Sequence, residues 1–372
     1  MSISWQSFGN RLIQSASVRR VPLAAQLELT SRCNLRCKMC YVCSINNQNE
    51  LINKERTAKE WIELARQAKE AGVLYLLLTG GEVFIRKDFR EIYEAISEMG
   101  FIVQIYSNGT LITPEIAKWL GKRPPAKISI TMYGASPETY QRVTGHADAY
   151  ERAVRGVDLL REEGILTKIR TTVIRDNRQD IDKLYEFAVG RDIEFGTVFT
   201  IIGRREGNDT DPSGVRLSAK EVIEFEDYFY NYLSSRKRSQ GDETAENKII
   251  AQDIEDLVEK TDIKGKHNNA FKCSAGHSSF WVTWDGRMTP CGSLPEPSVD
   301  VFSLGMEKAW EELKRLADEV PQCGACEVCK YKVHCSKCPA KLYVESGGFT
   351  KCAQYLRDIA YHKELQRNAG NF

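Results

Sequence analysis

The sequence predicts an α/β protein with a parallel sheet, followed by a C-terminal segment that is rich in cysteine. Between about residues 24 and 201, short and continuously apolar stretches alternate with amphipathic stretches of helical length. Continuously apolar strands of this kind belong to parallel sheets whose outer face is covered by helices. Eight of the twelve cysteines then lie between Cys273 and Cys352. A chain of 372 residues has room for two or three domains.

The expected strands and helices alternate six times, which is too few for a closed eight-fold barrel. We expect strands at 24–30, 73–79, 101–107, 127–132, 168–174 and 195–201. We expect helices between them at 57–71, 88–99, 114–121, 149–163 and 179–190.

Several helix ends are marked by local sequence. Thr57 and Glu60 have the spacing of a capping box, in which each side chain bonds the other residue's backbone N–H. Gly72 follows that helix as a C-terminal glycine. Thr113 and Ser136 each precede a proline, which is the arrangement of a cap residue before the first helical position.

Three features complete the expected organisation. Residues 203–214 are polar and predict a mobile loop, and two helices at about 218–236 and 243–260 follow it. Asp285 and Gly286 then form a strong hairpin-turn signal between two apolar stretches. We expect an N-terminal extension at 1–20, the sheet domain at 21–215, bridging helices at 216–272 and the cysteine-rich domain at 273–372.

Composition excludes several classes of partner. The formal net charge is +1, which gives no overall field that would attract nucleic acid or an anionic membrane. No apolar run is long enough to span a bilayer, and residues 1–20 lack the apolar core of a secretory signal. We therefore expect a cytoplasmic protein. In such a protein, dense cysteine indicates metal binding rather than a disulfide scaffold.

The most informative group of cysteines is the C-x3-C-x2-C run formed by Cys33, Cys37 and Cys40, directly after the first expected strand. A [4Fe–4S] cluster normally takes four cysteine ligands, so three thiolates would leave one iron open to a substrate or cofactor. The alternative is a zinc site, which would need a fourth ligand from elsewhere in the chain.

This run closely resembles the cluster motif of the radical S-adenosylmethionine (SAM) enzymes. The resemblance implies a partial (β/α)6 barrel with its site at the carboxyl ends of the strands, and an open iron chelated by the amino and carboxylate groups of SAM. Gly80, Gly81 and Glu82 follow the second expected strand. Paired glycines let a backbone approach a ligand closely, and a carboxylate accepts hydrogen bonds from an ammonium group. By resemblance, these three residues grip the amino group of SAM.

Other strand ends carry further candidates for SAM contacts. By resemblance these are Ser107, Asn108, Thr131 and Arg142, with Asn177 as a weaker candidate. Ordinary structural roles remain open for some of them. Asn108 begins an Asn–Gly turn signal, and Arg142 has the alternative of an exposed helix arginine.

The C-terminal cysteines resemble the SPASM domain, which holds auxiliary iron–sulfur clusters in peptide- and protein-modifying radical SAM enzymes. The resemblance assigns to an outer cluster Cys326, Cys329, Cys335 and Cys352. It assigns to an inner cluster Cys273, Cys291 and Cys338, with Cys323 as our choice for the fourth ligand because it completes a count of eight.

Two details leave alternatives open in this segment. One residue fewer than in the SPASM pattern separates Cys335 from Cys338, and two C-x2-C pairs are also typical of zinc knuckles. His277 and His334 adjoin the cysteines, and we expect them to face solvent or support the ligands rather than bind metal. Cys43 is left over and is expected in packing or at the surface.

The resemblance implies an oxidoreductase that reductively cleaves SAM to a 5′-deoxyadenosyl radical, which removes hydrogen from an unactivated carbon. Two auxiliary [4Fe–4S] clusters favour net oxidation, because they can accept the electron left on the substrate. We therefore expect an enzyme that oxidatively modifies a ribosomally synthesised peptide, with cross-linking as the expected modification. The sequence does not indicate which acid or base assists the reaction, which bond is formed or what the oligomeric state is.

Alternatives remain within and outside this chemistry. Maturation of a sulfatase and oxidative processing of a cofactor precursor use the same radical. An alternative outside enzyme catalysis is a zinc or iron–sulfur scaffold that binds a peptide without reacting with it. The Gly-Gly-Glu motif argues against this alternative, because a scaffold has no need of a SAM pocket. The expected partners are a peptide substrate, an electron donor of flavodoxin or ferredoxin type and, for any leader peptide, a separate recognition protein. We expect neither a nucleic acid nor a membrane partner.

Overall fold

The computed structural model describes residues 5–42, 51–205, 212–240 and 270–368. Its central feature is a curved, nine-stranded sheet in the order β6-β5-β4-β3-β2-β1-β7-β8-β9. Neighbouring strands from β6 to β7 pair in parallel, whereas β8 and β9 are antiparallel. The strands are β1 (Ala24–Glu28), β2 (Tyr75–Thr79), β3 (Ile102–Ser107), β4 (Lys127–Thr131), β5 (Thr167–Thr172), β6 (Glu194–Val198), β7 (Ser279–Val282), β8 (Arg287–Thr289) and β9 (Val299–Asp300).

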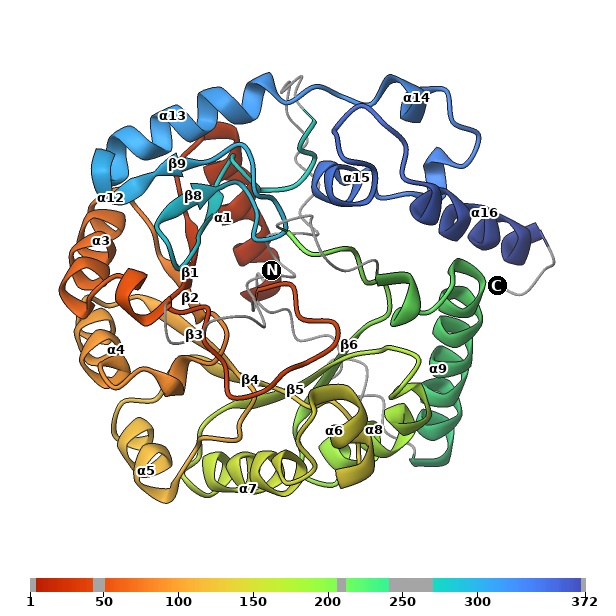
Figure 1. Cartoon of the computed structure of the whole chain (residues 1–372), viewed down its shortest axis with the longest axis horizontal. Coiled ribbons are helices and arrows are strands. Elements are labelled where there is room, and N and C mark those ends of the chain that lie inside the picture. The colour runs from red at the N-terminus through yellow and green to blue at the C-terminus, as the bar shows by residue number, and fades with distance from the viewer. Residues whose placement is uncertain (1–4, 43–50, 206–211, 241–269, 369–372) are drawn as a thin grey trace.

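Helices surround the sheet on its outer face (Figure 1). In the barrel region they are α3 (Ala58–Glu70), α4 (Phe89–Glu98), α5 (Pro114–Lys122), α6 (Pro137–Thr144), α7 (Ala149–Glu162), α8 (Ile181–Val189) and α9 (Ala219–Gln240). The chain begins with α1 (Trp5–Arg19) and ends with α12 (Val301–Leu304), α13 (Met306–Glu319), α14 (Gly324–Glu327), α15 (Pro339–Ser346) and α16 (Gln354–Asn368). The predicted partial barrel and the cysteine-rich C-terminal region are both confirmed.

The helix caps form as the sequence predicts. The Thr57 side chain accepts the backbone N–H of Glu60, while the Glu60 side chain accepts that of Thr57. Thr113 and Ser136 likewise cap α5 and α6 ahead of their prolines. These bonds satisfy backbone donors that the first turn of a helix leaves unpaired, so they fix where each helix begins.

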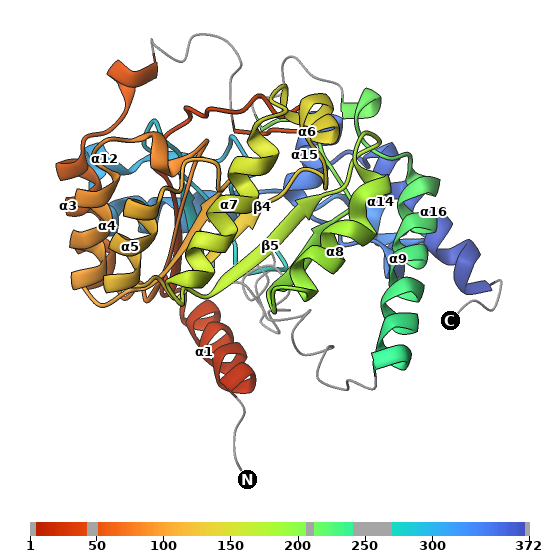
Figure 2. The ribbon, with the colours of Figure 1, turned by 90° about the horizontal axis from the view of Figure 1, so that it is seen from below.

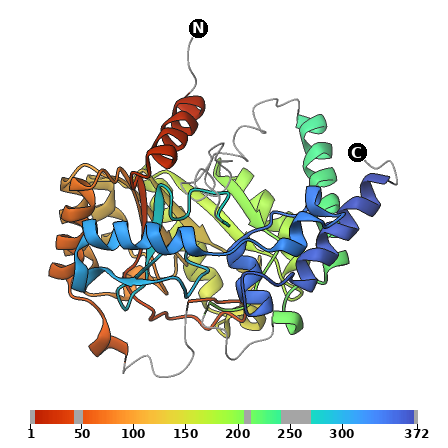
Figure 3. The same cartoon turned by 90° about the horizontal axis from the view of Figure 1, so that it is seen from above.

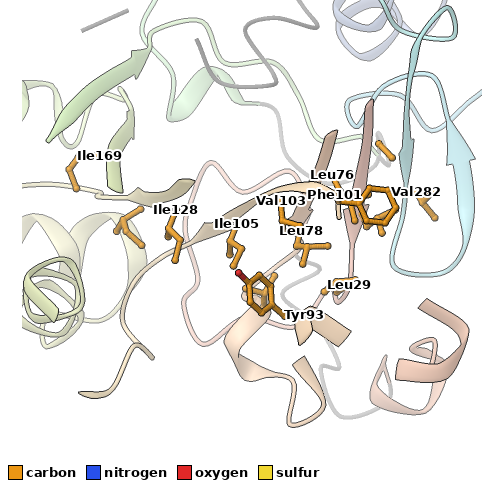
Figure 4. Close-up of a cluster of buried hydrophobic side chains, with 14 of the residues drawn as sticks. Leu29, Leu76, Leu78, Tyr93, Phe101, Val103, Ile105, Ile128, Ile169 and Val282 are labelled. Atoms are coloured by element: carbon orange, nitrogen blue, oxygen red, sulfur yellow. The ribbon is translucent and has the colours of Figure 1, made fainter. Parts of the chain in front are cut away.

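Alternating residues on each strand point to opposite faces of the sheet. One set forms the apolar core beneath the outer helices, as Figure 4 shows for Leu29, Leu76, Val103, Ile128 and Ile169. The residues between them face the concave side, which we call the barrel interior. This interior holds the polar and charged side chains of the strands.

The C-terminal region continues the barrel sheet, which the sequence did not indicate. The predicted hairpin around Gly286 is confirmed as β7 and β8, and Gly286 has a φ of 97°. β7 also pairs in parallel with β1, for example Gln26 opposite Trp281. The cysteine-rich segment is therefore anchored directly to the first barrel strand.

The N-terminal extension at 1–20 contains α1, which packs at the amino ends of the first strands. Ile13 and Ala16 of α1 share a buried apolar cluster with Leu23, Ala24 and Tyr75. Figures 2 and 3 show α1 projecting from this edge of the sheet. It therefore lies at the end of the sheet opposite to the predicted site.

The C-terminal helices face α9 across the remaining side of the barrel (Figure 1). The hydroxyl of Tyr355 donates to the carbonyl of Leu217, and Arg216 forms a largely buried ion pair of 2.6 Å with Glu345. The first expected bridging helix is confirmed as α9, while the second, at about 243–260, lies outside the described residues. Within the described ranges, every helix is too short or too polar to span a bilayer.

Candidate active site

The three-cysteine loop leaves the carboxyl end of β1 and is fixed against α6. The backbone N–H of Arg36 donates to the carbonyl of Thr144, and that of Lys38 donates to the carbonyl of Val143. Leu35 and Cys37 are buried in an apolar cluster that also contains residues of α6 and α7. The loop is therefore fixed both by the burial of its apolar side chains and by the hydrogen bonds of its backbone.

A cavity of about 170 Å³ opens beside this loop at the carboxyl ends of β1 to β5. It brings together most of the residues predicted for the site. Its lining includes Cys33, Cys37, Cys40, Thr79, Gly80, Gly81, Tyr106, Ser107, Asn108, Thr131, Tyr133 and Thr172. Residues from five successive strand ends thus surround one space, as expected for a barrel of this kind.

The Cys37 thiol of this cavity is costly to ionise without a cation. Burial, and then the neighbouring Cys40 thiol, raise the pKa of Cys37 well above its ordinary value. Burial and the thiols likewise raise the pKa of Tyr133. Iron ions would supply the positive charge that these thiolates need, so the donor set fits a cluster. Among the described residues, no three His, Cys, Asp or Glu side chains converge closely enough to hold a single metal ion.

Gly80 and Gly81 are required because the end of β2 runs directly against the cysteine loop. A Cβ at Gly80 would lie 2.3 Å from the Thr30 carbonyl oxygen, and one at Gly81 would lie 2.2 Å from the Arg32 carbonyl oxygen. The N–H of Gly81 donates to the Thr30 carbonyl at 2.7 Å, and the N–H of Glu82 donates to the Arg32 carbonyl at 2.8 Å. No other residue type fits here without moving the loop that carries Cys33.

Glu82 is fully buried behind the two glycines. Its carboxylate accepts hydrogen bonds from the Ser107 hydroxyl (2.9 Å) and from the N–H groups of Asn108 (2.7 Å) and Phe84 (3.2 Å). Burial outweighs these bonds and raises the pKa of Glu82 to about 7. No lysine or arginine pairs with it in the described part of the chain. A buried carboxylate without a cation fits the ammonium group of SAM.

Ser107 and Asn108 have positioning roles in the structure. Ser107 and the backbone of Asn108 orient Glu82, as described above. The Asn108 side-chain amide donates to the side-chain oxygen (Oδ1) of Asn34 at 3.0 Å and lies 3.7 Å from the Cys33 sulfur. These contacts join the third strand to the cysteine loop, and direct contact with SAM stays a prediction for both residues.

Arg142 and Asn177 are not part of the cavity lining. Arg142 is exposed on α6, where it donates to the Thr139 hydroxyl at 2.8 Å and to the Asp176 carbonyl at 3.4 Å. Asn177 is buried, and its amide donates to the carbonyls of Tyr133 and Thr172. Asn177 therefore braces the loop that carries Tyr133, and the structure does not bring Arg142 to the other candidates.

The comparison with known families decides what this cavity is. Residues 27–188 match the model of the radical SAM superfamily. The chain carries a radical SAM domain. That domain spans β1 to α8, and so includes the cysteine loop and the Gly-Gly-Glu motif.

Relatives of known activity resemble the chain over most of its length. The AdoMet-dependent heme synthase of Methanosarcina barkeri is 27% identical over 348 residues, which is 91% of this chain and 97% of that protein. The PqqA peptide cyclase of Rhizobium meliloti is 26% identical over 334 residues, which is 86% of this chain and 83% of that protein.

Two solved structures share this fold over most of the chain. Streptococcus suis SuiB bound to the precursor peptide SuiA has a TM-score of 0.66 at 17% identity, covering 97% of this chain and 81% of that one. Native anSMEcpe with bound AdoMet has a TM-score of 0.65 at 18% identity, covering 94% and 97%. At these identities the likeness concerns the fold, and it extends beyond the radical SAM domain into the C-terminal region.

The C-terminal cysteines, which follow the radical SAM domain, fall into two groups. Four of them surround one narrow, apolar pocket, namely Cys326, Cys329, Cys335 and Cys352. Three others pack around a second apolar cluster near Phe271, namely Cys273, Cys291 and Cys338. These are the same sets that the SPASM resemblance assigns to the outer and inner clusters. None of the eleven cysteines in the described ranges forms a disulfide, and Cys43 lies outside those ranges.

Cys323 is placed differently from our expectation. It packs beside Cys326 in a cluster with Leu342 and Leu356, and its thiol donates to the Thr350 carbonyl at 3.2 Å. The structure therefore brings it to the outer set rather than to the inner one. Burial, and then the nearby Cys323 thiol, raise the pKa of Cys326 to about 12. Of the two histidines, His277 is almost fully buried with Nε2 3.4 Å from the Phe271 carbonyl.

One buried polar group was missed by sequence reasoning. The Glu28 carboxylate on β1 accepts hydrogen bonds from Arg205 at 2.7 and 3.1 Å and from the Trp281 indole at 2.8 Å. Arg205 also donates to the carbonyl of Gly292, the neighbour of Cys291. Arg205 belongs to the segment that we expected as a mobile polar loop, yet it is 2% exposed. The available signal was Glu28 itself, a charge at an interior-facing position of an apolar strand.

Proposed function

We propose that this radical SAM enzyme oxidatively modifies a peptide substrate, using two auxiliary clusters in its C-terminal region. The observation that carries the proposal is the cavity at the strand ends, where three thiols, two glycines and a buried carboxylate meet. A scaffold that merely binds a peptide would have no need of a buried carboxylate held without a cation.

Each part of the cavity has a definite role in this proposal. Cys33, Cys37 and Cys40 would hold a [4Fe–4S] cluster, and Glu82 would bind the ammonium group of SAM across Gly80 and Gly81. When bound, the cluster and SAM supply a 5′-deoxyadenosyl radical by one-electron reduction. The protein's own contribution is to fix the cysteine loop against the end of β2 and to keep the carboxylate of Glu82 out of water.

The C-terminal thiols support the oxidative character of the reaction. The outer set around Cys326 and the inner set around Cys291 would each hold a [4Fe–4S] cluster, and clusters of this kind transfer single electrons. Arg205 pairs with Glu28 of β1 and also binds the carbonyl of Gly292, next to Cys291 of the inner set. This contact fixes the distance between the inner set and the cavity. This arrangement suits net oxidation of the substrate, with an external flavodoxin- or ferredoxin-type protein as the electron partner.

A peptide substrate is supported by two of the relatives. The PqqA peptide cyclase is named for a peptide, and SuiB was solved with its precursor peptide. The fold likeness to SuiB covers 97% of this chain. Any leader peptide would be recognised by a separate protein or by the helices around α9.

A second candidate substrate class is a heme precursor. The M. barkeri heme synthase aligns with 97% of its own length, so it has nearly the same extent as this chain. Maturation of a sulfatase remains a third candidate within the same chemistry. All three share the radical SAM step and differ in the molecule that loses hydrogen.

The testing experiment is anaerobic purification with cluster reconstitution, followed by metal analysis and a SAM cleavage assay under dithionite. We expect about twelve irons per chain, which is three [4Fe–4S] clusters, together with 5′-deoxyadenosine. The Glu82→Gln variant should retain its iron and lose most of its SAM binding. About four irons with bound zinc would remove the auxiliary clusters from the proposal, and a protein without iron or cleavage would refute it entirely.

The substrate is then assigned by mass spectrometry. The reconstituted enzyme is incubated separately with peptides encoded beside its gene and with Fe-coproporphyrin III. Loss of two hydrogen atoms from a peptide would support the peptide reading. A mass change in the porphyrin alone would replace it with the heme-precursor reading.

A further inference from the structure

The outer cysteine set lies at the surface of the C-terminal region. Cys352 is exposed, and Cys326, Cys329 and Cys335 are half-buried around their pocket. The segment from α14 to α16, which carries these cysteines, forms one edge of the molecule in Figure 1. A cluster held by the outer set would therefore be within reach of a partner protein that approaches from solvent.

Two valines beside the outer cysteines are unusually exposed. Val328, which precedes Cys329, is 86% exposed, and Val333, two residues before Cys335, is 75% exposed. They are the two most exposed large apolar side chains in the described part of the chain. Apolar contacts form the centre of protein interfaces, while the rim stays polar. Two such side chains on one cysteine loop therefore indicate a surface that a partner covers.

Basic side chains accompany the two valines. Lys332, Lys337 and Arg357 line the pocket of the outer set, and none of the described residues that line it is acidic. All three are exposed, as expected when an aliphatic stem covers an apolar pocket and the charged end stays in water. Lys330 is exposed as well, and its ammonium lies 4.7 Å from the centre of the Tyr331 ring.

Ion pairs within the chain do not neutralise these four cations. Over the described ranges none of them forms an ion pair with a carboxylate, and the Lys332 ammonium donates to the backbone carbonyl of Glu327 at 2.9 Å. Residues 324–368 contain eight lysines and arginines and four acids, a formal net charge of +4 in a chain whose total is +1. Because the four cations are exposed and most of the pocket thiols are half-buried, an approaching protein meets the positive charge first.

We propose that this surface binds an acidic protein that carries single electrons. We call it the outer patch, and its residues are Val328, Lys330, Lys332, Val333, Lys337 and Arg357. The inference rests on the proposed function and gives its electron partner a place on the surface. Acidic side chains of the carrier would pair with the cations, which speeds association and orients the two proteins. A small patch suits such a partner, because complexes of electron-transfer proteins have small interfaces.

The test uses oxidised flavodoxin, an acidic flavin protein, as the probe on the reconstituted enzyme without SAM or substrate. The Kd is measured by isothermal titration calorimetry at low and at physiological salt. We expect the double variant Lys330→Glu with Lys332→Glu to weaken binding by about tenfold to a hundredfold. We expect Val328→Ser with Val333→Ser to weaken it by about fivefold.

The controls separate the outer patch from charge in general. All four substituted side chains are exposed, so these variants leave the core intact. Lys118→Glu reverses an exposed lysine of α5, on the other side of the barrel in Figure 1, and should leave the Kd unchanged. Raising the salt should weaken binding to the unsubstituted enzyme more than binding to the lysine variant, because salt screens exposed charges.

Three results would overturn the inference. The first is absence of flavodoxin binding, or an equal Kd in all variants. The second is loss of binding in Lys38→Glu, an exposed lysine of the three-cysteine loop, with binding retained in the patch variants, which would place the carrier beside the cavity. The third is equally tight binding of a short DNA duplex, which would assign the outer patch to nucleic acid. Failure of the proposed function would be seen separately, as absence of 5′-deoxyadenosine under dithionite, an assay without flavodoxin.

Discussion

The burial of Glu82 predicts an unusual pH dependence of stability. Its pKa is about 7 in the folded protein, compared with an ordinary value of 4.5. A carboxyl group whose pKa is raised by folding contributes full stability only below pH 4.5 and loses it as the pH rises through 7. The difference of two and a half pKa units corresponds to about 3 kcal/mol, of which about 2 kcal/mol is lost between pH 5.5 and 8.

The assay compares the wild-type protein with Glu82→Gln, whose amide cannot ionise. Urea unfolding of the SAM-free, reconstituted protein is followed by tryptophan fluorescence at several values of pH. We expect the free energy of unfolding of the wild type to fall relative to that of the variant by about 2 kcal/mol from pH 5.5 to 8. Other titrating groups contribute equally to both proteins, so they cancel in this difference.

With saturating SAM, the free energy of unfolding of the wild type should no longer fall relative to that of Glu82→Gln as the pH rises. The ammonium group of SAM then compensates the ionised carboxylate of Glu82. The stabilisation by SAM should therefore grow with pH in the wild type and stay constant in Glu82→Gln. Parallel pH profiles for the two SAM-free proteins would refute the reasoning, since they would mean that Glu82 is already solvated or paired.

Three further predictions concern other parts of the molecule. Gly81→Ala should displace the cysteine loop and lower the iron content by about four atoms, the amount of one cluster, as iron analysis would show. Glu28→Gln should destabilise the protein by about 3 kcal/mol in urea unfolding, because it leaves the Arg205 charge buried without its partner. Cys326→Ser should also remove about four irons, whereas Cys323→Ser should either leave the count unchanged or reveal Cys323 as a cluster ligand by lowering it.

The barrel was predictable because its signals are local. Each strand from 24 to 201 is a short apolar run, and the helices α3, α5 and α6 each begin at a capping side chain, so boundaries such as Thr57 and Thr113 agree with the structure. α1 was not predicted, because its apolar stripe is weak and it is stabilised by packing against β1 and β2 rather than by its own sequence. The pairing of β7 with β1 was also missed, since no local signal indicates which strand edge a distant hairpin will join.

The site was predictable to the extent that motif spacing determines it. The three cysteines and the Gly-Gly-Glu triplet are each contiguous in sequence, and the cavity contains all of them except the buried Glu82. Arg142 lies outside the cavity because the turn of α6 that carries it faces solvent. The Glu28–Arg205 pair joins residues 177 positions apart, so only the folded chain reveals that a residue of a polar loop is buried.

The same contacts explain why the Gly-Gly-Glu triplet acts as a unit. The glycines allow the end of β2 to lie against the cysteine loop, and that close approach is what removes Glu82 from water. Burial makes the carboxylate unfavourable until a cation arrives, and three hydrogen bonds hold it in position meanwhile. Part of the affinity for an ammonium group is therefore already present in the folded protein as destabilisation that binding relieves. A side chain at either glycine would remove this property by opening the site to water, even if Glu82 itself were retained.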